Sequence, residues 1–399
     1  KSTWGYPADV SRLLKVLRNT AIGLVAFYLA LFGFTKVIHY PDPIATIRLG
    51  LAPASKTPDL MPSHVIKAGN KVSDWKMGTP ETPGNVVYNG KTISFQNFLD
   101  TTNTNAFLII RDGKINYEYY KAKKFSEVRL PSYSVGKTMT SLVVGQLIDQ
   151  GKISEKETFV KYFPEFKTGG SFDTITIQQL LDMQSGVGVS DNYPSGPSGW
   201  GVAIAQMYGG TDMHWFLMHN RKMAFEPGTE SIYRSVDPQM IGMIIKKVTG
   251  QSVSDYFSEH IWKIVGAEHD ATWNVDHVGG IEKTFCCFNA FARDYARVGQ
   301  LVMNNGVVPE TKQQVISASW MKRITSPVTR LDYDWGYGAY TWHPYPGVSL
   351  MLGLHGQFVY MDIPHKTLIV KLSDEPTDSD NKSPMVAAVL KQVAERTTS

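Results

Sequence analysis

The chain has 399 residues, which is long enough for two or three domains and for a core that needs no disulfide or metal to be stable. Apolar residues make up 43% and charged residues 19%, a composition that excludes a disordered or fibrous protein. Forty Lys and Arg against 36 Asp and Glu leave a net charge of only +4, which excludes nucleic acid as an expected partner.

An apolar segment lies near the N-terminus. Residues Ala21–Phe34 (AIGLVAFYLALFGF) contain no charge and no proline, and Arg12, Lys15 and Arg18 precede them. By the positive-inside rule this pattern predicts a single-pass anchor within residues 1–40, in a bacterial inner membrane, with the rest of the chain on the periplasmic side. No small-x-small cleavage site follows, which favours an uncleaved anchor. The alternative is a buried helix of the globular domain.

A proline-rich segment follows the apolar one. Seven of the 21 prolines fall between Pro41 and Pro83. Such a density suppresses regular structure, so residues 41–84 are expected to form a linker draped over the surface. The folded domain is then expected to comprise residues 85–399.

Strands and helices alternate in blocks after residue 85. Two apolar runs, Ala106–Ile110 and Lys114–Tyr120, are joined by Asp-Gly and predict a hairpin. Apolar residues at spacings of three and four then predict helices over residues 134–151, 177–183 and 238–248. Between them, Ser185–Gly210 is rich in Gly, Ser, Pro and Tyr and predicts a long functional loop.

The last third of the chain returns to strands. Helices are expected at Ala292–Met303 and Ser317–Ile324, and a terminal helix at Ser383–Glu395. Three strand-like segments lie between them: Tyr337–Trp342, Val348–Met361 and Thr367–Leu372. Strands on both sides of a helical block predict an α+β fold. In it, helices flank one antiparallel sheet built from both ends of the chain, and a helical subdomain of about residues 134–260 is inserted.

The two cysteines, Cys286 and Cys287, are neighbours in sequence. A bridge between neighbours closes no useful loop, and no Cys or His lies at metal-ligand spacing around them. We expect two small buried side chains with neither a disulfide nor a metal.

Several catalytic signatures are missing. The sequence has no G-x-S-x-G, no H-E-x-x-H and no G-x-x-x-x-G-K-[ST]. These absences argue against an α/β-hydrolase, against a zinc enzyme with the H-E-x-x-H motif and against a nucleotide-binding loop, in that order. Neither a metal nor an organic cofactor is expected.

The motif S-x-x-K occurs at Ser134–Lys137, where it opens a long and nearly uncharged helix. Residues three apart share one helix face, so the Lys amine lies near the Ser hydroxyl. A buried, neutral Lys is able to take the hydroxyl proton, and the Ser backbone N–H at the first turn is free to bind an oxyanion. The same pattern recurs at Ser73, Ser319 and Ser379, but in a proline-rich segment, a short amphipathic helix and an acidic loop.

Two further groups of residues support this site. Tyr233-x-Ser235 precedes a helix, and a Tyr hydroxyl beside a Lys amine is able to relay protons. The segment Gly353-Leu354-His355-Gly356-Gln357 lies in a strand, where glycines permit close approach and an edge N–H completes an oxyanion hole. For Tyr233 the alternative is a packed ring with its hydroxyl in water, and for His355 it is a structural histidine.

The order of these motifs resembles that of the serine β-lactamase-like hydrolases, which include class C β-lactamases, D-Ala-D-Ala peptidases and related esterases. Within them the chain is most similar to the 6-aminohexanoate-dimer hydrolases, which are nylon-oligomer amidases. The stretches that carry the likeness are SYSVGKTMTSLVVGQLIDQGKI, QQLLDMQSGVGVSDNY, SGW, ARDYARVGQLVMNNGVV and LHGQFVYMDIPHKTLIVKLS, from about Phe95 to the C-terminus.

The resemblance implies a role for each matching residue. Ser134 is the expected nucleophile, Lys137 its base and Tyr233 the proton donor to the leaving group. Backbone N–H groups of Ser134 and Leu354 are the expected oxyanion hole. The residues expected to contact a small-molecule substrate are Tyr193, Trp200, Ser235, His355 and Gln357.

The sequence also departs from the family pattern. Met351-Leu352-Gly353 replaces the K-T-G of β-lactamases, so a cation that recognises a penicillin carboxylate is absent. Arg234 either binds a substrate carboxylate or points to solvent. At Ser195 the amidases can carry an acidic residue that binds the substrate amine.

These observations predict a serine hydrolase that cleaves an amide or ester through an acyl-enzyme. The alternatives are a cell-wall D,D-peptidase or weak β-lactamase, and a non-catalytic binding or sensor protein on the same fold. No sequence pattern indicates an oligomeric state.

Overall fold

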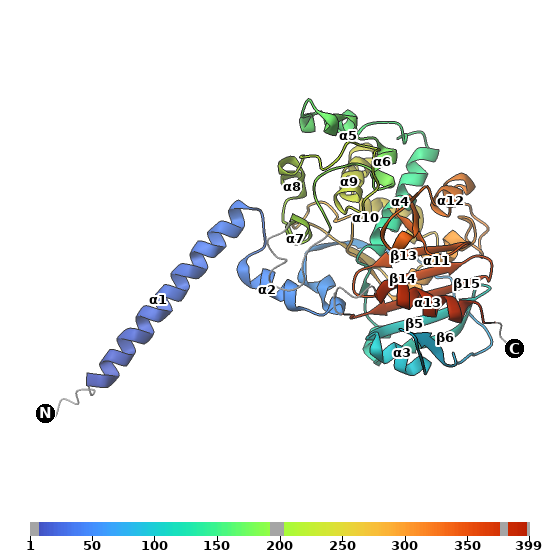
Figure 1. Cartoon of the computed structure of the whole chain (residues 1–399), viewed down its shortest axis with the longest axis horizontal. Coiled ribbons are helices and arrows are strands. Elements are labelled where there is room, and N and C mark those ends of the chain that lie inside the picture. The colour runs from blue at the N-terminus through green and yellow to red at the C-terminus, as the bar shows by residue number, and fades with distance from the viewer. Residues whose placement is uncertain (1–7, 192–202, 376–381, 397–399) are drawn as a thin grey trace.

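The computed structural model describes residues 8–191, 203–375 and 382–396. Its centre is a nine-stranded sheet in the order β10-β11-β12-β13-β14-β15-β5-β6-β2. Helices cover the sheet, a helical lobe rises from one side of it, and the long helix α1 projects away from both (Figure 1). The predicted α+β fold with an inserted helical lobe is confirmed.

The sheet joins strands from the two ends of the chain. β5 (Thr104–Arg111) and β6 (Lys114–Tyr120) form the predicted hairpin, and β15 (Thr367–Ser373) pairs antiparallel with β5. The Asp-Gly turn is possible because Asp112 and Gly113 both have positive φ. The other strands of this sheet are β2 (Lys76–Met77), β10 (Thr329–Arg330), β11 (Gly336–Gly338), β12 (Thr341–His343), β13 (Val348–Gly353) and β14 (Gln357–Asp362).

Two predicted strands are each two strands in the structure. Val348–Met361 is divided into β13 and β14 by a turn at residues 354–356, so the segment Gly353–Gln357 is not one strand as expected. The segment Tyr337–Trp342 contains a reversal between β11 and β12, because Ala339 and Tyr340 adopt φ of 46° and 63°. Neither residue is a glycine, so the pattern of side chains did not indicate this turn.

Helices cover the faces of the sheet. α11 (Ala292–Met303) packs against β14, β15 and β5, and α13 (Lys382–Ala394) packs against β14 and β15 (Figure 1). Both were expected within one residue of their observed ends. α3 (Phe95–Thr101) contacts β5 and the small hairpin of β3 (Val86–Tyr88) and β4 (Lys91–Ile93).

The helical lobe is built around α4 (Val135–Asp149) and α9 (Val236–Thr249). Every residue of α4 from Val135 to Leu147 is buried, so any charged side chain on this helix lies in the protein interior. The remaining helices of this block and of its border with the sheet are α5 (Phe159–Tyr162), α6 (Ile177–Leu181), α7 (Ala203–Gly209), α8 (Met213–His219), α10 (Val253–Phe257), the π-helical turn η6 (Ser258–Trp262) and α12 (Ala318–Ile324). The end of the expected loop Ser185–Gly210 is thus the helix α7.

Residues 41–84 contain more regular structure than their prolines suggested. They form α2 (Pro43–Leu51), the 3₁₀ helix η1 (Ala54–Leu60) and the strands β1 (Ser63–Ile66) and β2. The Asp42 side chain caps α2, and Pro43 occupies the first turn, where a missing N–H costs nothing. β1 joins a second sheet, β1-β8-β9-β7, with β8 (Ala271–Asn274), β9 (Phe288–Ala290) and β7 (Leu130–Pro131).

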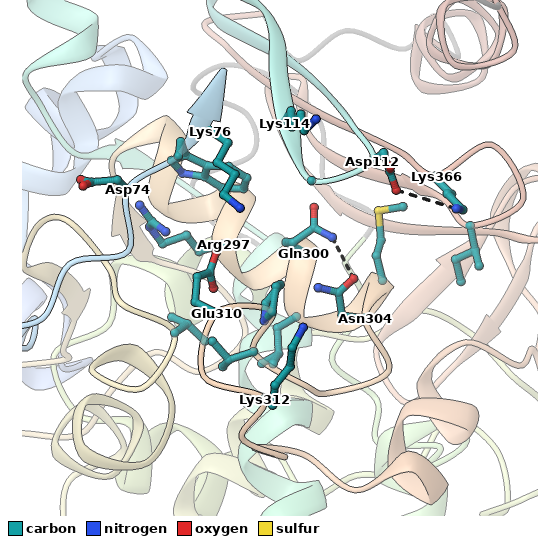
Figure 2. A pocket seen from close by; sticks show the side chains of 18 residues that line it. Asp74, Lys76, Asp112, Lys114, Arg297, Gln300, Asn304, Glu310, Lys312 and Lys366 are labelled. Atoms are coloured by element: carbon teal, nitrogen blue, oxygen red, sulfur yellow. Dashed lines mark hydrogen bonds and ion pairs between the residues drawn. The ribbon is translucent and has the colours of Figure 1, made fainter. Parts of the chain in front are cut away.

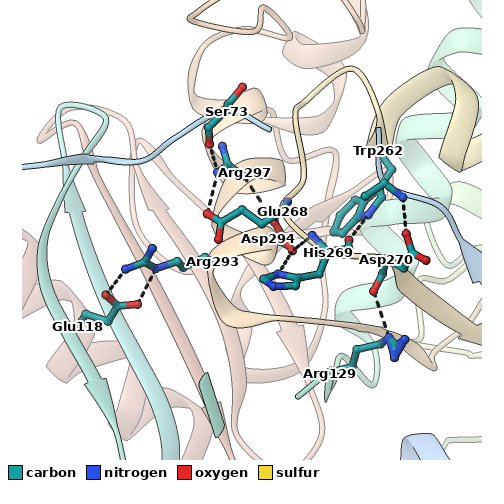
Figure 3. Close-up of polar contacts among 11 residues, drawn as sticks. Ser73, Glu118, Arg129, Trp262, Glu268, His269, Asp270, Arg293, Asp294 and Arg297 are labelled. Carbon is teal, nitrogen blue, oxygen red and sulfur yellow. Dashed lines mark hydrogen bonds and ion pairs between the residues drawn. The ribbon is translucent and has the colours of Figure 1, made fainter. Parts of the chain in front are cut away.

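A buried arginine ties this N-terminal segment to the domain. Figure 3 shows the Arg297 guanidinium donating to the Ser73 carbonyl and pairing with Glu268, at 2.9 Å. Asp294 lies 3.5 Å from the same guanidinium. The two acidic side chains hold Arg297 in place, and its hydrogen bond to the Ser73 carbonyl joins the segment to α11.

Among the described residues, α1 (Ala8–Val37) is the one helix long and apolar enough to cross a membrane, over Val10–Val37. Only 6% of that stretch is buried against the rest of the protein. The alternative of a core helix is therefore wrong. The helix is also longer than the uncharged run Ala21–Phe34 on which the expectation rested.

Cys286 and Cys287 are both buried, as expected, but they are joined in a disulfide. The expectation of two free thiols is wrong. The bridge forms between chain neighbours because Cys287 adopts a positive φ of 68°.

Candidate active site

Ser134 lies at the entrance to α4, where the chain turns sharply. Tyr133, directly before it, has a φ of 44°, and Lys137 N–H donates to the Ser134 carbonyl at 3.0 Å. The turn leaves the Ser134 side chain partly exposed at the boundary between the sheet and the helical lobe. A hydroxyl in this position is accessible to a substrate.

Lys137 is 1% exposed, and its amine has three partners. The Nζ atom lies 2.7 Å from Ser134 Oγ, 3.0 Å from Ser235 Oγ and 2.8 Å from the Phe285 carbonyl oxygen. It also lies 4.7 Å from the centre of the Tyr233 ring. The predicted contact between Lys137 and Ser134 is present.

Burial lowers the pKa of Lys137 from 10.5 to about 7, because a charged amine loses its hydration in the protein interior. The negative charges of Asp191 and Asp237 oppose this shift and raise the pKa in part. At neutral pH a large fraction of Lys137 is therefore the neutral amine, which is the form able to accept a proton.

Tyr233 reaches the site from the turn before α9. Its hydroxyl forms a hydrogen bond with the Ser134 side chain, and its ring stacks on Trp342 with 5.5 Å between centroids. Burial raises the pKa of Tyr233 well above its usual range. The group is thus a neutral phenol that is held beside the Ser134 hydroxyl and is able to pass on a proton.

Asp191 is a member of the site that the sequence did not reveal. Its carboxylate accepts hydrogen bonds from Ser235 Oγ at 2.5 Å and from Ser235 N–H at 2.6 Å. Burial raises the pKa of Asp191. No motif spacing relates it to Ser134 or to Tyr233.

Ser235 was expected to contact substrate, and the structure gives it another place. Its side chain is buried, with the hydroxyl between Asp191 and Lys137. Because that hydroxyl donates its proton to Asp191, its oxygen accepts from Lys137. The Ser235 side chain therefore holds Lys137 and does not face the substrate.

The three partners of Lys137 settle where its lone pair points. A neutral amine has two N–H donors and one lone pair. The Phe285 carbonyl and the Ser235 oxygen both accept, so they take the two N–H groups. The lone pair is left for the Ser134 hydroxyl, which is the geometry that a general base requires.

Arg234 does not face solvent, so that alternative is wrong. It is buried, it donates to the Val189 carbonyl at 3.3 Å and it lies over the Phe225 ring. Its charge lowers the pKa values of the nearby Asp191 and Asp237. Burial nevertheless raises the pKa of Asp237 to about 8.

The C-terminal end of β13 passes directly beside the nucleophile. A Cβ atom on Gly353 would collide with the Ser132 carbonyl oxygen and lie 3.2 Å from Ser134 N. Within the described part of the chain, the backbone N–H groups of Ser134 and Leu354 donate no hydrogen bond. Both are thus available at the place where an oxyanion hole is expected.

His355 and Gln357 have structural partners. The Gln357 amide is buried and bonds to Ser373 N, the Ser373 carbonyl and the His355 carbonyl, so its expected substrate contact is wrong. His355 donates through Nδ1 to the Glu375 carbonyl at 2.7 Å, which leaves its Nε2 with a lone pair. Burial lowers the pKa of His355, so this ring is neutral.

Two predicted site residues, Tyr193 and Trp200, lie outside the described residues. Of the other S-x-x-K patterns, Lys76 and Lys322 are both exposed, so neither has the burial that makes Lys137 a base. Ser379 also lies outside the described residues.

A cavity of about 600 Å³ lies elsewhere, between the β5–β6 turn, the end of α11 and the segment before β2 (Figure 2). None of Ser134, Lys137 and Tyr233 lines it. Lysines and the acidic residues Asp74, Asp112 and Glu310 line it together. None of the buried groups proposed for catalysis points into it. The cavity therefore does not compete with Ser134 as the candidate active site.

The sheet is built from strands of both ends of the chain, and a helical lobe is inserted between them. A serine, a lysine and a tyrosine meet where the sheet and the lobe join. This arrangement is that of serine hydrolases of the β-lactamase type. The beta-lactamase family model matches residues 95–392, and the chain belongs to this family. The predicted family membership is confirmed.

Individual relatives agree with this assignment. The chain is 30% identical to 6-aminohexanoate-dimer hydrolase from Paenarthrobacter ureafaciens, over 71% of this chain and 76% of that one. It is 27% identical to a candidate D-alanyl-D-alanine carboxypeptidase of Escherichia coli K12, over 41% of each chain. A candidate 6-aminohexanoate-dimer hydrolase from Bacillus anthracis has the same fold, with a TM-score of 0.74, 24% identity and coverage of 89% and 94%. The chain is thus a β-lactamase-family serine hydrolase that resembles 6-aminohexanoate-dimer hydrolase.

Proposed function

We propose that the chain hydrolyses a small-molecule amide or ester through an acyl-enzyme on Ser134. The observation that carries this proposal is the buried Lys137 amine, which lies 2.7 Å from Ser134 Oγ while the Ser235 oxygen and the Phe285 carbonyl accept its N–H groups. A buried lysine without a use is costly, so its position favours a catalytic role.

Acylation begins when Lys137 takes the hydroxyl proton and Ser134 Oγ attacks the substrate carbonyl carbon. The negative charge on the tetrahedral oxygen is bound by the backbone N–H groups of Ser134 and Leu354, each worth about 3 kcal/mol in comparable sites. The C–N or C–O bond of the substrate then breaks. The leaving amine or alcohol receives a proton from Tyr233, and Tyr233 regains one from the Lys137 ammonium, so that the proton taken from Ser134 ends on the leaving group.

Deacylation follows the same path with water in place of the leaving group. Water gives a proton to the Tyr233–Lys137 pair and its oxygen attacks the acyl carbon. The ester bond to Ser134 breaks, and the proton returns to Ser134 Oγ as the carboxylic acid is released. No cofactor takes part in this scheme.

Amide substrates are favoured by the similarity to 6-aminohexanoate-dimer hydrolase. A D,D-peptidase or weak β-lactamase is the second candidate, favoured by the carboxypeptidase relative. The residue that stands in place of the K-T-G lysine, Met351, is buried in β13, so that position supplies no cation to a substrate carboxylate. A non-catalytic sensor is disfavoured because the network of Ser134, Lys137 and Tyr233 is complete.

The proposal includes an uncleaved anchor. The 17 residues between Arg18 and Lys36 span about 26 Å as a helix, close to the thickness of a bilayer core of about 30 Å. Lys36 reaches the interface at one end, and Arg12, Lys15 and Arg18 hold the other end in the cytoplasm. The hydrolase domain then lies on the periplasmic side of the inner membrane.

Hydrolysis of p-nitrophenyl esters and p-nitroanilides by Ser134→Ala and Ser319→Ala variants tests the proposal. Ser319 begins another S-x-x-K pattern, but its lysine is exposed. We expect Ser134→Ala to lose about 10³-fold or more in kcat and Ser319→Ala to match the wild type. Full activity in Ser134→Ala would overturn the proposal.

A further inference from the structure

The helix α2 carries an apolar face that the protein does not cover. Ile44, Ile47 and Leu51 recur at spacings of three and four and are 57%, 46% and 71% exposed. Arg48 lies on the same face and is exposed as well. Three aliphatic side chains with one arginine among them are typical of a helix in the headgroup layer of a membrane.

α2 lies where a membrane would be if α1 spans it. Only five residues, 38–42, separate the end of α1 from the start of α2, and the two helices are in contact (Figure 1). Five residues reach at most about 18 Å even when extended. The outer end of the anchor therefore keeps α2 close to the bilayer surface.

The same short connection is fastened to the helical lobe. The Tyr40 hydroxyl donates to the Ala205 carbonyl in α7 at 3.1 Å, and the His39 ring packs on Trp215 in α8 with 4.5 Å between centroids. Thr211 N–H donates to the His39 carbonyl at 2.8 Å. The position of α7 and α8 relative to the membrane is thus set by the base of the anchor.

Another exposed aliphatic side chain, outside α2, lies near this base. His277 contacts the Thr211 carbonyl at 3.1 Å, and its neighbour Val278 is 88% exposed. Thr211 is the residue that bonds to His39. An exposed apolar side chain thus also lies outside α2, on a segment that adjoins the base of the anchor.

The candidate active site is next to these elements. Tyr208 in α7 stacks on Tyr133, the residue before Ser134, with 6.2 Å between centroids. Thr57 in η1, which follows α2, lies 3.3 Å from the Tyr133 hydroxyl. Tyr133 is thus held from two sides by the elements that adjoin the anchor.

Aliphatic side chains also border the reacting groups. Ile232, next to Tyr233, is 43% exposed, and Leu354, whose N–H is placed in the oxyanion hole, is 39% exposed. Exposed apolar surface beside a catalytic group fits a hydrocarbon chain better than it fits a charged peptide.

We propose that α2 lies in the headgroup layer of the outer leaflet, that the active site is thereby held at the membrane surface, and that the substrate is a membrane-dissolved amide or ester with a long hydrocarbon chain. This inference rests on the proposed function and names its substrate class. The bilayer is the partner of the α2 face because only five residues join α2 to the outer end of α1 and the two helices are in contact.

The test compares two triple variants of the full chain, reconstituted in phosphatidylcholine vesicles. The first is Ile44→Gln, Ile47→Gln and Leu51→Gln. The matched control, Met77→Gln, Val87→Gln and Ile363→Gln, changes three exposed apolar residues that lie away from α1 and α2. Gln keeps helix propensity while it removes apolar surface.

Two substrates are used, p-nitrophenyl butyrate in solution and p-nitrophenyl palmitate dissolved in the vesicles. We expect the α2 variant to lose about tenfold in the hydrolysis of the palmitate ester while its butyrate activity stays within about twofold of the wild type. The control variant should match the wild type on both. Equal palmitate rates for all three proteins, or equal losses on both esters, would overturn the proposal.

A spin label at Ile47→Cys gives a readout that does not depend on catalysis. We expect relaxation by lipid-soluble oxygen to exceed relaxation by an aqueous nickel complex at this position, and the reverse at Val87→Cys. A wild type that hydrolyses neither ester would contradict the proposed function, whereas a water-exposed label at residue 47 would contradict the membrane contact of α2.

Discussion

At the residue scale, the account depends on the protonation state of one amine. Lys137 accepts a proton from Ser134 only as the neutral form, and burial brings its pKa to about 7. Asp191 acts on this amine in two ways. Its charge raises the pKa of Lys137, and its hydrogen bond from Ser235 makes the Ser235 oxygen an acceptor.

The dependence of kcat/KM on pH follows from this arrangement. As the pH rises through about 7, Lys137 loses its proton, so kcat/KM should rise and then level off. In Asp191→Asn the carboxylate charge that raises this pKa is gone, so the rising limb should move to lower pH, with a plateau lower by about tenfold. The exposed Asp112→Asn variant is the control. A rising limb that stays at the same pH in Asp191→Asn would contradict the assignment.

Tyr233 should matter more for amides than for activated esters. An amine leaving group needs a proton, whereas p-nitrophenolate leaves without one, so Tyr233→Phe should slow p-nitroanilide hydrolysis by about 10²-fold or more and ester hydrolysis much less. The control is Tyr360→Phe, which removes a buried hydroxyl without a hydrogen-bond partner. Equal losses in the hydrolysis rates of both substrates would show that Tyr233 does not donate the proton to the leaving group.

The spacing of Ser134 and Lys137 and the later Tyr233 were sufficient to predict the centre of the site. Asp191 was not predictable in the same way, because its partner Ser235 is 44 residues away and only the folded chain brings them together. Ser235, Arg234 and Gln357 were assigned to substrate contact or to solvent. All three are buried, and burial of a polar residue with an internal partner leaves no local pattern in the sequence.

At the scale of elements, β13 and the turn before α4 must approach closely to form the oxyanion hole. Gly353→Ala should push them apart, since its Cβ would collide with the Ser132 carbonyl. We expect a fall of at least about tenfold in kcat with an intact fold. Gly145→Ala is the contrasting variant, because its Cβ would collide with Trp320 far from Ser134.

Gly145→Ala should lower the free energy of unfolding by about 1–3 kcal/mol while kcat per folded molecule stays at the wild-type value. Thermal unfolding and kinetics measured on the same samples separate the two effects. If Gly353→Ala kept full activity, the end of β13 would not take part in the oxyanion hole.

Long periodic elements were predicted well and short ones were not. α4, α9 and α11 have apolar residues at helical spacing, and Gly250, with a φ of 68°, ends α9. α2 was missed because the prolines in and around it suggested a linker, yet Pro43 stands in a first turn capped by Asp42. The disulfide of Cys286 and Cys287 depends on a backbone angle that sequence does not show.

At the scale of the whole molecule, the anchor determines where the chemistry takes place. We expect the full chain to remain in the membrane pellet after alkaline carbonate extraction, because α1 is long and apolar enough to span the bilayer. A chain that begins at His39 lacks α1 and should be released. Release of the full chain, or retention of the shortened one, would contradict a spanning α1.

The measurement that tests the central claim most directly is the mass of the protein during turnover of a p-nitrophenyl ester. The account predicts a burst of nitrophenol close to one equivalent and one acyl group added to the wild type, located by peptide mapping on Ser134. Ser134→Ala should show neither the burst nor the added mass. An acyl group on another residue, or steady turnover in Ser134→Ala, would contradict the account.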